Sequence, residues 1–148
     1  MKNALVVYDS VFGNTRSIAE AIGRGIGAGV PVVSAAELTA ERLAGVELLV
    51  VGSPTTGGRP TKALVAALDR IPAGALASVR VAAFDTRLSV KFVKIFGFAA
   101  ARIATVLESK GGKVTATPVG FIVGGRGGPL AAGEPERAER WGKDLAGR

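Results

Sequence analysis

The sequence predicts an α/β fold, a doubly wound parallel sheet with helices on both faces. Four apolar runs rich in Val, Leu and Ala recur along the chain, at residues 4–8, 30–34, 47–52 and 79–84. Each run is typical of a strand buried on both faces, and segments with helical periodicity separate the runs. Buried strands that alternate with helices indicate a parallel sheet between two helical layers.

The first three helices are predicted from apolar spacing and capping signals. In residues 15–26 an Ile recurs every fourth position, which is typical of a surface helix with one buried stripe. Ser34 followed by Glu37 forms a possible capping box for a short second helix. Pro60 suits the first turn of a third helix.

The carboxyl-terminal part of the chain predicts two more helices and an edge strand. Residues 99–110 carry an apolar face and end at two glycines, a favourable helix exit. Residues 113–119 are interrupted by Pro118, which predicts an edge strand with a bend or break. A last helix begins near Glu134, and we expect its Trp141 to anchor the core.

Two glycine-rich stretches lie outside the predicted strands, at residues 23–29 and 124–129. The first lies at the end of the first helix and not in the turn after the first strand, so it predicts helix termination and not dinucleotide binding. The second predicts a surface loop that leads into the last helix.

The composition limits both the architecture and the chemistry. A chain of 148 residues, 48% hydrophobic and 21% charged, fits one globular domain over residues 1–148. The absence of Cys and His excludes thiol nucleophiles, disulfides, thiolate metal sites and histidine bases, so a redox function needs a cofactor. The amino-terminal apolar segment is too short for a signal peptide or membrane span, so we expect a cytoplasmic protein without membrane insertion.

The net charge of +7 favours a basic surface with no nucleic-acid function. The Lys and Arg residues are scattered, and no basic run of five or more occurs. A solvated basic surface is the simplest interpretation, and electrostatic steering favours acidic partners over basic ones.

The loop after the first strand is the first candidate for ligand binding, because doubly wound sheets bind ligands at the carboxyl ends of their strands. Unpaired N–H groups at a helix start attract phosphate, and neighbouring short polar side chains add donors. The candidate residues are Ser10, Val11, Phe12, Gly13, Asn14 and Thr15. An ordinary strand-to-helix turn capped by Asn14 or Thr15 is the alternative.

The same six residues resemble the phosphate loop of the flavodoxin family, in which a hydroxyl residue is followed by Gly-Asn-Thr. This resemblance implies a flavodoxin-like three-layer α/β/α sandwich with a five-stranded sheet of order 2-1-3-4-5, and flavin mononucleotide (FMN) as the cofactor. Phe12 stands where the family more commonly has a hydroxyl residue, so we expect weaker binding of FMN.

The loop after the third strand resembles the flavodoxin loop that lines one face of the flavin ring. The residues that the resemblance places at the ring are Ser53, Pro54, Thr55, Thr56 and Gly57. Many flavodoxins carry a stacking aromatic residue here, whereas this chain has Thr56. Taken without the first loop, the segment would indicate only a turn.

The loop after the fourth strand resembles the flavodoxin segment that contacts the polar edge of the ring. Its candidates are Phe84, Asp85, Thr86 and Arg87; the alternative for Phe84 is the last core residue of the strand, which is the commoner role of an isolated Phe. The aromatic residues that follow, interleaved with lysines, fit a shield for the ring, a docking surface or packing under a loop; they are Phe92, Phe96, Phe98, Lys91 and Lys94. If the Arg87 guanidinium lies near the flavin N1 edge, it stabilises the anionic reduced flavin.

The leading hypothesis is an FMN-binding electron-transfer protein with a redox partner, more a carrier than a self-sufficient oxidoreductase. A quinone or flavin reductase that uses a nicotinamide cofactor is an alternative, as is a flavin-free regulatory or partner-binding module. A phosphorylation receiver domain has the same strand order but needs an acidic residue after strand three and a lysine after strand five. Ser53 and Val119–Gly120 stand there instead.

Overall fold

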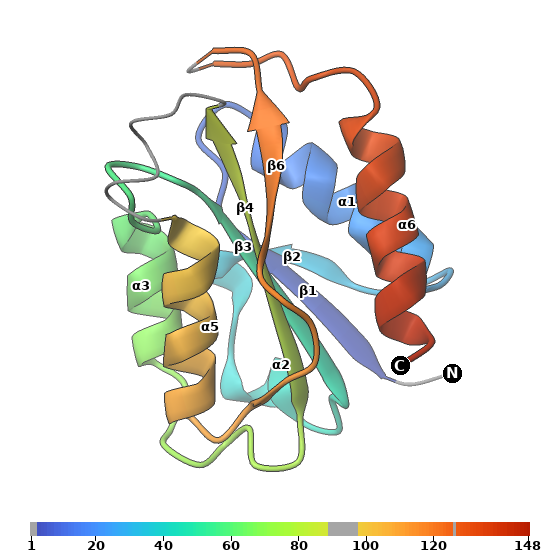
Figure 1. Cartoon of the computed structure of the whole chain (residues 1–148). Helices are drawn as coiled ribbons and strands as arrows, with labels where there is room; N and C mark the ends of the chain where they lie inside the picture. Colours follow the sequence, from blue (N-terminus) through green and yellow to red (C-terminus); the bar gives the residue numbers. More distant parts are fainter. Residues whose placement is uncertain (1–2, 89–97, 126) are drawn as a thin grey trace.

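The computed structural model describes residues 3–88, 98–125 and 127–148, and it forms three layers, helix, sheet and helix. Figure 1 shows α1 (Asn14–Ile26) and α6 (Glu134–Ala146) on one face of the sheet, with α3 (Lys62–Asp69) and α5 (Ala99–Ser109) on the other. The predicted sandwich is therefore confirmed.

The sheet is parallel throughout and has the order β2-β1-β3-β4-β5. Its strands are β1 (Ala4–Tyr8), β2 (Val32–Ser34), β3 (Leu48–Pro54), β4 (Arg80–Leu88) and β5 (Lys113–Val114). A sixth strand, β6 (Val119–Val123), pairs with the carboxyl half of β4. The predicted break near Pro118 thus separates two short strands that share one neighbour.

Alternate residues of the central strands supply two apolar cores, because successive side chains of a strand point to opposite faces. Leu5, Val7, Leu49 and Val51 pack under α3 and α5, whereas Val6, Leu48 and Val50 pack under α1 and α6. The second core also holds an aromatic cluster of Phe84, Phe121 and Trp141, whose ring centroids lie 6.2–6.3 Å apart in edge-to-face contacts. Trp141 is partly buried there, in agreement with its predicted position in the core.

The caps differ from the predictions in two places. The Ser34 N–H donates to Glu37 Oε1 at 2.9 Å, but this box closes a short 3₁₀ turn, η1 (Ala35–Glu37), and α2 (Ala40–Leu43) begins later. Thr61, and not Pro60, lies at the start of α3, where its hydroxyl accepts the N–H of Leu64 at 3.3 Å. The helix begins two residues further on than the proline signal implied, because the Thr61 side chain satisfies a free N–H and proline does not.

The glycines near the end of α1 do more than terminate it. Gly27 is the carboxyl cap, but Gly23 and Gly25 lie inside the helix. A Cβ on Gly25 would lie 2.0 Å from the main-chain oxygen of Glu139 in α6, and one on Gly142 would lie 2.3 Å from the oxygen of Ile22. Glycine at these positions therefore allows the backbones of α1 and α6 to touch, which sequence spacing alone did not indicate.

Side chains of α6 hold β6 in place at the edge of the sheet. Glu134 Oε2 accepts the N–H of Ile122 at 2.7 Å, and Arg137 Nη2 donates to the Gly120 carbonyl at 2.6 Å. The two side chains also pair with each other at 2.7 Å. The hydrogen bond from Arg137 lowers the pKa of Glu134, although partial burial opposes this, and the Ile122 N–H lowers it further.

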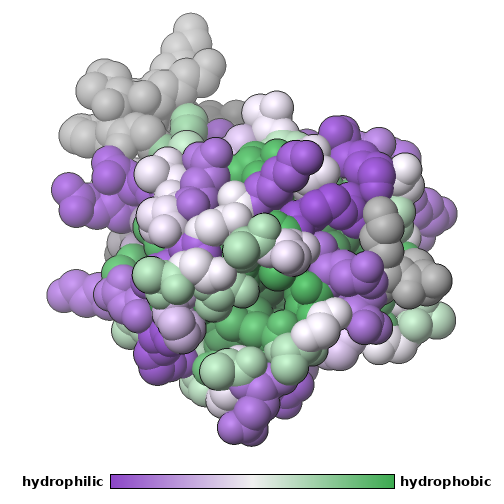
Figure 2. All heavy atoms as spheres, turned by 90° about the horizontal axis from the view of Figure 1, so that it is seen from below, coloured by the Kyte–Doolittle hydropathy of each residue, from purple (hydrophilic) through white to green (hydrophobic). Residues whose placement is uncertain are grey.

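Figure 2 views the molecule from the amino ends of the strands, where apolar atoms at the centre are surrounded by polar and charged side chains. Within the described ranges, none of the helices combines the length and the apolar character that crossing a bilayer requires. The pocket described next lies at the opposite end, where the strands finish.

Candidate functional site

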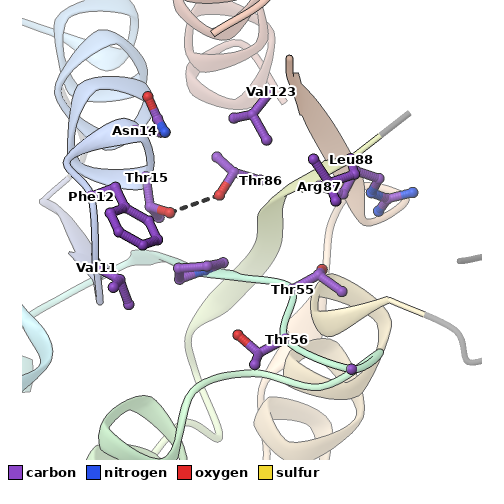
Figure 3. Close-up of a pocket in the computed structure, with 12 residues that line it drawn as sticks. Val11, Phe12, Asn14, Thr15, Thr55, Thr56, Thr86, Arg87, Leu88 and Val123 are labelled. Atoms are coloured by element: carbon purple, nitrogen blue, oxygen red, sulfur yellow. Dashed lines mark hydrogen bonds between the residues drawn. The ribbon is translucent and has the colours of Figure 1, made fainter. Parts of the chain in front are cut away.

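A pocket of about 420 Å³ opens at the carboxyl ends of β1, β3 and β4 (Figure 3). All three predicted loops contribute to it, which brings together residues far apart in the sequence. It is lined by Val11, Phe12, Asn14, Thr15, Pro54, Thr55, Thr56, Gly57, Thr86, Arg87, Leu88 and Val123. Among the described residues that line it, Arg87 is the one that carries a charge, and the others are neutral, four of them threonines with hydroxyl groups.

The first loop turns into α1 at Gly13, whose φ of +93° is a conformation that favours glycine. Ser10 Oγ accepts the N–H of Gly13 at 3.0 Å and that of Arg16 at 3.4 Å, which curls the loop around this hydroxyl. The N-cap residue, Gly13, has no side chain to cap the helix, and the N–H groups of Asn14 and Thr15 donate to none of the described residues. These free amides lie at the positive end of the helix dipole, as the loop sequence predicted.

Two hydroxyl groups join the start of α1 to the end of β4. Thr15 Oγ1 and Thr86 Oγ1 lie 2.8 Å apart, and both residues are buried. Figure 3 shows this contact as a dashed line between the two labelled side chains. Because each hydroxyl has one proton and two lone pairs, the pair can still exchange hydrogen bonds with a ligand.

The glycine-rich loop 124–129 also reaches this site, although the sequence predicted only a surface loop. A Cβ on Gly128, which has a φ of +100°, would lie 2.8 Å from both side-chain polar atoms of Asn14. The Asn14 amide has no hydrogen-bond partner in the described part of the chain. Because residue 128 is a glycine, the backbone there can pack directly against the Asn14 side chain at the start of α1.

The second predicted segment, residues 53–57, begins with the buried Ser53, and its other residues line the pocket. The Ser53 hydroxyl donates to the Pro54 carbonyl at 2.9 Å and accepts the N–H of Thr61 at 3.0 Å, so this side chain holds the loop to α3 and does not line the pocket. Thr56 and Arg59 exchange backbone hydrogen bonds of 2.8 and 3.1 Å around two glycines with positive φ. This tight turn forms the outer wall of the pocket, with Thr56 exposed.

The third segment is part of β4 and not a loop, because pairing with β6 extends the strand to Leu88. The Phe84 ring lies in the aromatic core, over Gly52, where an added Cβ would lie 2.1 Å from the ring. Phe84 is therefore the last core residue of the strand, the second of the two interpretations that its position allowed. Leu88 and Val123, which sequence reasoning missed, line the pocket because β4 and β6 run side by side.

Asp85 and Arg87, both in β4, form an ion pair on the side of the strand that faces α5. The fully buried Asp85 carboxylate accepts Arg87 Nε at 2.7 Å, Arg87 Nη2 at 2.8 Å and the Ala100 N–H at 2.9 Å. The guanidinium lies 3.5 Å from the centre of the Phe98 ring, and a Cβ on Gly120 would lie 2.0 Å from Arg87 Nε. In Figure 3 the Arg87 side chain extends away from Thr15 and Thr86.

The positive charge of Arg87 is balanced by the negative charge of Asp85. The sequence led us to expect Arg87 to stabilise an anionic reduced flavin, and the structure shows that this arginine is paired bidentately with a buried carboxylate. Phe98 packs on this arginine, whereas Phe92, Phe96, Lys91 and Lys94 lie outside the described residues.

Known proteins resemble this chain in sequence and in structure. The profile of the family described as Flavodoxin matches residues 6–141. A flavodoxin from the domain Archaea is 27% identical, covers 99% of this chain and 97% of its own, and superposes with a TM-score of 0.73. Oxidised flavodoxin 1 from Bacillus cereus is 17% identical, with 98% and 97% coverage and a TM-score of 0.79.

Part of a larger protein has the same fold. The flavodiiron core of a Synechocystis protein is 22% identical and superposes with a TM-score of 0.73 over 99% of this chain but 35% of its own, so this chain spans about a third of that protein. No curated protein sequence matches at a significant level. The family profile covers nearly the whole chain, including the first loop and most of α6, and the chain therefore belongs to the flavodoxin family, whose members bind flavin.

Proposed function

We propose that this protein binds FMN in the pocket at the carboxyl ends of β1, β3 and β4 and carries electrons between redox partners. The single observation that carries the proposal is the donor set at the start of α1. Three kinds of donor lie on one side of the pocket. They are the main-chain N–H groups of Asn14 and Thr15, which have no acceptor among the described residues, the side-chain amide of Asn14, and the hydroxyl pair of Thr15 and Thr86. Such a set suits a phosphate group.

The residues present fit the group that the family implies. The lining combines hydrogen-bond donors on the α1 side with neutral, partly apolar walls from Pro54, Leu88 and Val123. Gly128 packs closely against the Asn14 side chain beside the pocket, and Gly57 has a positive φ in the turn that lines it. A ligand with one anionic end and one flat apolar end matches this division of the pocket.

In the proposed function, the start of α1 holds the phosphate, and the Thr55–Gly57 wall flanks the ring. The side chains of four other predicted residues, Ser10, Ser53, Phe84 and Asp85, are engaged elsewhere, and Gly13 has none, so these residues would act on the ligand through their backbone or through neighbouring side chains. The bound flavin supplies the redox chemistry, and the protein supplies binding, orientation and electrostatics.

The test compares the binding of FMN and riboflavin to the purified protein by isothermal titration calorimetry. We expect FMN to bind more tightly than riboflavin. In Thr15→Val, which keeps the side-chain shape, FMN affinity falls about tenfold or more, because a hydrogen bond to a charged group contributes roughly 1.5–3 kcal/mol. Riboflavin binding stays unchanged in this variant.

Ser17→Ala provides the matched control, since this hydroxyl lies in the same helix and donates to the Gly13 carbonyl outside the pocket lining. Equal affinities for FMN and riboflavin would contradict the phosphate site, and no binding of either would contradict the function. NADPH oxidation by the FMN-loaded protein with a quinone and no added partner would instead identify a reductase.

A further inference from the structure

A groove of about 480 Å³ runs between α3 and α5, on the face of the sheet opposite to α1 and α6. Figure 1 shows these two helices side by side. The groove is lined by apolar side chains along its length, and Val65 is 42% exposed there. The apolar lining consists of Pro60, Val65, Ala66, Leu68, Ile103 and Val106.

Three cations gather at the amino-terminal ends of the two helices. Arg59 and Lys62 flank the start of α3, and Arg102 lies in the first turn of α5, where its Nε donates to the Gly58 carbonyl at 3.0 Å. All three side chains line the groove and are exposed. Asp69 lies at the other end of α3, about 10 Å further along the helix axis at 1.5 Å per residue.

These three charges are not neutralised within the described part of the chain. Arg16, Arg24, Arg137, Lys143 and Arg148 all pair with carboxylates, whereas Arg59, Lys62 and Arg102 have no acidic group within 4.0 Å. The sequence of residues 1–2, 89–97 and 126 contains no Asp or Glu. The end of the groove is therefore a local excess of positive charge next to exposed apolar surface.

One tight turn connects this groove to the proposed flavin pocket. Thr56 and Gly57 line the pocket, the Gly58 carbonyl is held by Arg102, and Arg59 lines the groove. A protein seated on the cationic end of the groove would thus contact the same turn that forms the outer wall of the pocket. Electrons would then pass between such a partner and a cofactor bound on the other side of this turn.

We propose that the α3–α5 groove is the docking surface for an acidic redox protein, whose carboxylates pair with Arg59, Lys62 and Arg102 while its apolar side chains cover Val65. The proposal rests on the proposed function, since it identifies the partner of the same site. Opposite charges around an apolar centre accelerate association and fix orientation. A nucleic acid is less well matched, because its binding needs a longer track of cations and gains nothing from the apolar lining.

The test reverses the three charges and measures electron transfer. The variant R59E/K62E/R102E is compared with R42E/K113E/R140E, which makes the same change in net charge on exposed residues away from the groove. Each FMN-loaded protein is reduced chemically and mixed in a stopped-flow instrument with a c-type cytochrome of negative net charge. The groove variant loses about tenfold or more in the second-order rate constant, and the control variant loses much less, because screening confines the effect to nearby charges.

Two further measurements make the outcome specific. A c-type cytochrome of positive net charge reacts faster with the groove variant than with the wild type. The double variant R59E/K62E leaves the Arg102 hydrogen bond intact, so the test stands even if the triple variant folds poorly. Equal losses in the groove and control variants overturn the docking surface while leaving the proposed function in place. If the wild type takes up no FMN, the proposed function fails and the docking proposal fails with it.

Discussion

The ion pair of Asp85 and Arg87 allows the sharpest prediction about this protein. Asp85 is fully buried and accepts three hydrogen bonds, two of them from Arg87. Arg87→Ala leaves the carboxylate in an apolar environment with the Ala100 N–H as its remaining donor. Removing one partner of a buried pair costs about 3–5 kcal/mol, and the lost cation–π contact with Phe98 adds about 0.5–1 kcal/mol. That is a large part of a total stability of about 5–15 kcal/mol.

The two single substitutions differ in cost because the partners differ in exposure. The Arg87 side chain is 19% exposed, so after Asp85→Asn the guanidinium can reach water, and we expect a loss of about 1–3 kcal/mol. In the double variant D85N/R87Q no charge is buried, and a hydrogen bond between the two amides can replace the pair. Its stability lies closer to the wild type than that of Arg87→Ala.

The assay is urea unfolding of the four proteins, followed by circular dichroism. Arg16→Ala is the control, because the Arg16–Glu20 pair is exposed on both sides and such pairs contribute about 0–1 kcal/mol. If Arg87→Ala costs no more than Arg16→Ala, the account of the buried pair is refuted.

The same variants separate two explanations of the reduction potential. An isolated cation near the flavin would raise the potential, and both Arg87→Ala and D85N/R87Q would then lower it. If the ion pair is electrically balanced, only Arg87→Ala lowers the potential, because it exposes the charge of Asp85 to the flavin. Redox titration of the FMN-loaded proteins distinguishes these outcomes, and we expect the potential of D85N/R87Q to match that of the wild type.

Three other predictions concern helix packing, pH and the first loop. Gly25→Ala forces α1 away from α6 and costs about 1–3 kcal/mol in urea unfolding, whereas Gly147→Ala, with its nearest contacts at 3.7 Å, leaves stability nearly unchanged. Because the pKa of Glu134 is lowered by Arg137, this carboxylate stabilises the fold above the pKa of the unfolded chain; its advantage over Glu134→Gln disappears as the pH falls through the lowered pKa, as acid titration of stability can check. Phe12→Thr restores a hydroxyl and strengthens FMN binding about two- to tenfold, and an unchanged Kd would show that this position is outside the phosphate contacts.

Local patterns predicted most of this fold because strands, helices and their order are encoded in apolar spacing. They failed where long-range contacts decide the outcome. Gly25 and Gly142 serve a helix crossing between elements more than a hundred residues apart, and nothing in their immediate neighbourhood indicates it. β4 extends through the polar residues Asp85 and Arg87 because β3 pairs with it as far as Thr86 and β6 as far as Leu88, and a polar sequence does not predict a strand.

The structure brings the three predicted segments together around one pocket, but it turns several of their side chains away from it. The backbone of the three segments lies around one pocket because parallel strands end at one edge of the sheet. The orientation of Ser53 and Phe84 depends on Thr61 and on the aromatic core, which come from distant parts of the chain. Leu88 and Val123 were missed for the same reason, since their position follows from the pairing of β4 with β6.

The alternation of side chains along β4 nonetheless predicts how charge is arranged at the pocket. Successive side chains of a strand point to opposite faces, so Phe84 and Thr86 belong to the α1 side, and Asp85 and Arg87 belong to the α5 side. The structure follows this division: Thr86 meets Thr15 of α1, while Asp85 accepts an amide from the first turn of α5. A strand of two-residue period thereby places neutral hydroxyls toward the proposed phosphate site and keeps the pair of opposite charges behind it. The basic character of the molecule is then left to its surface, where Arg59, Lys62 and Arg102 can act on a partner without altering the charge inside the pocket.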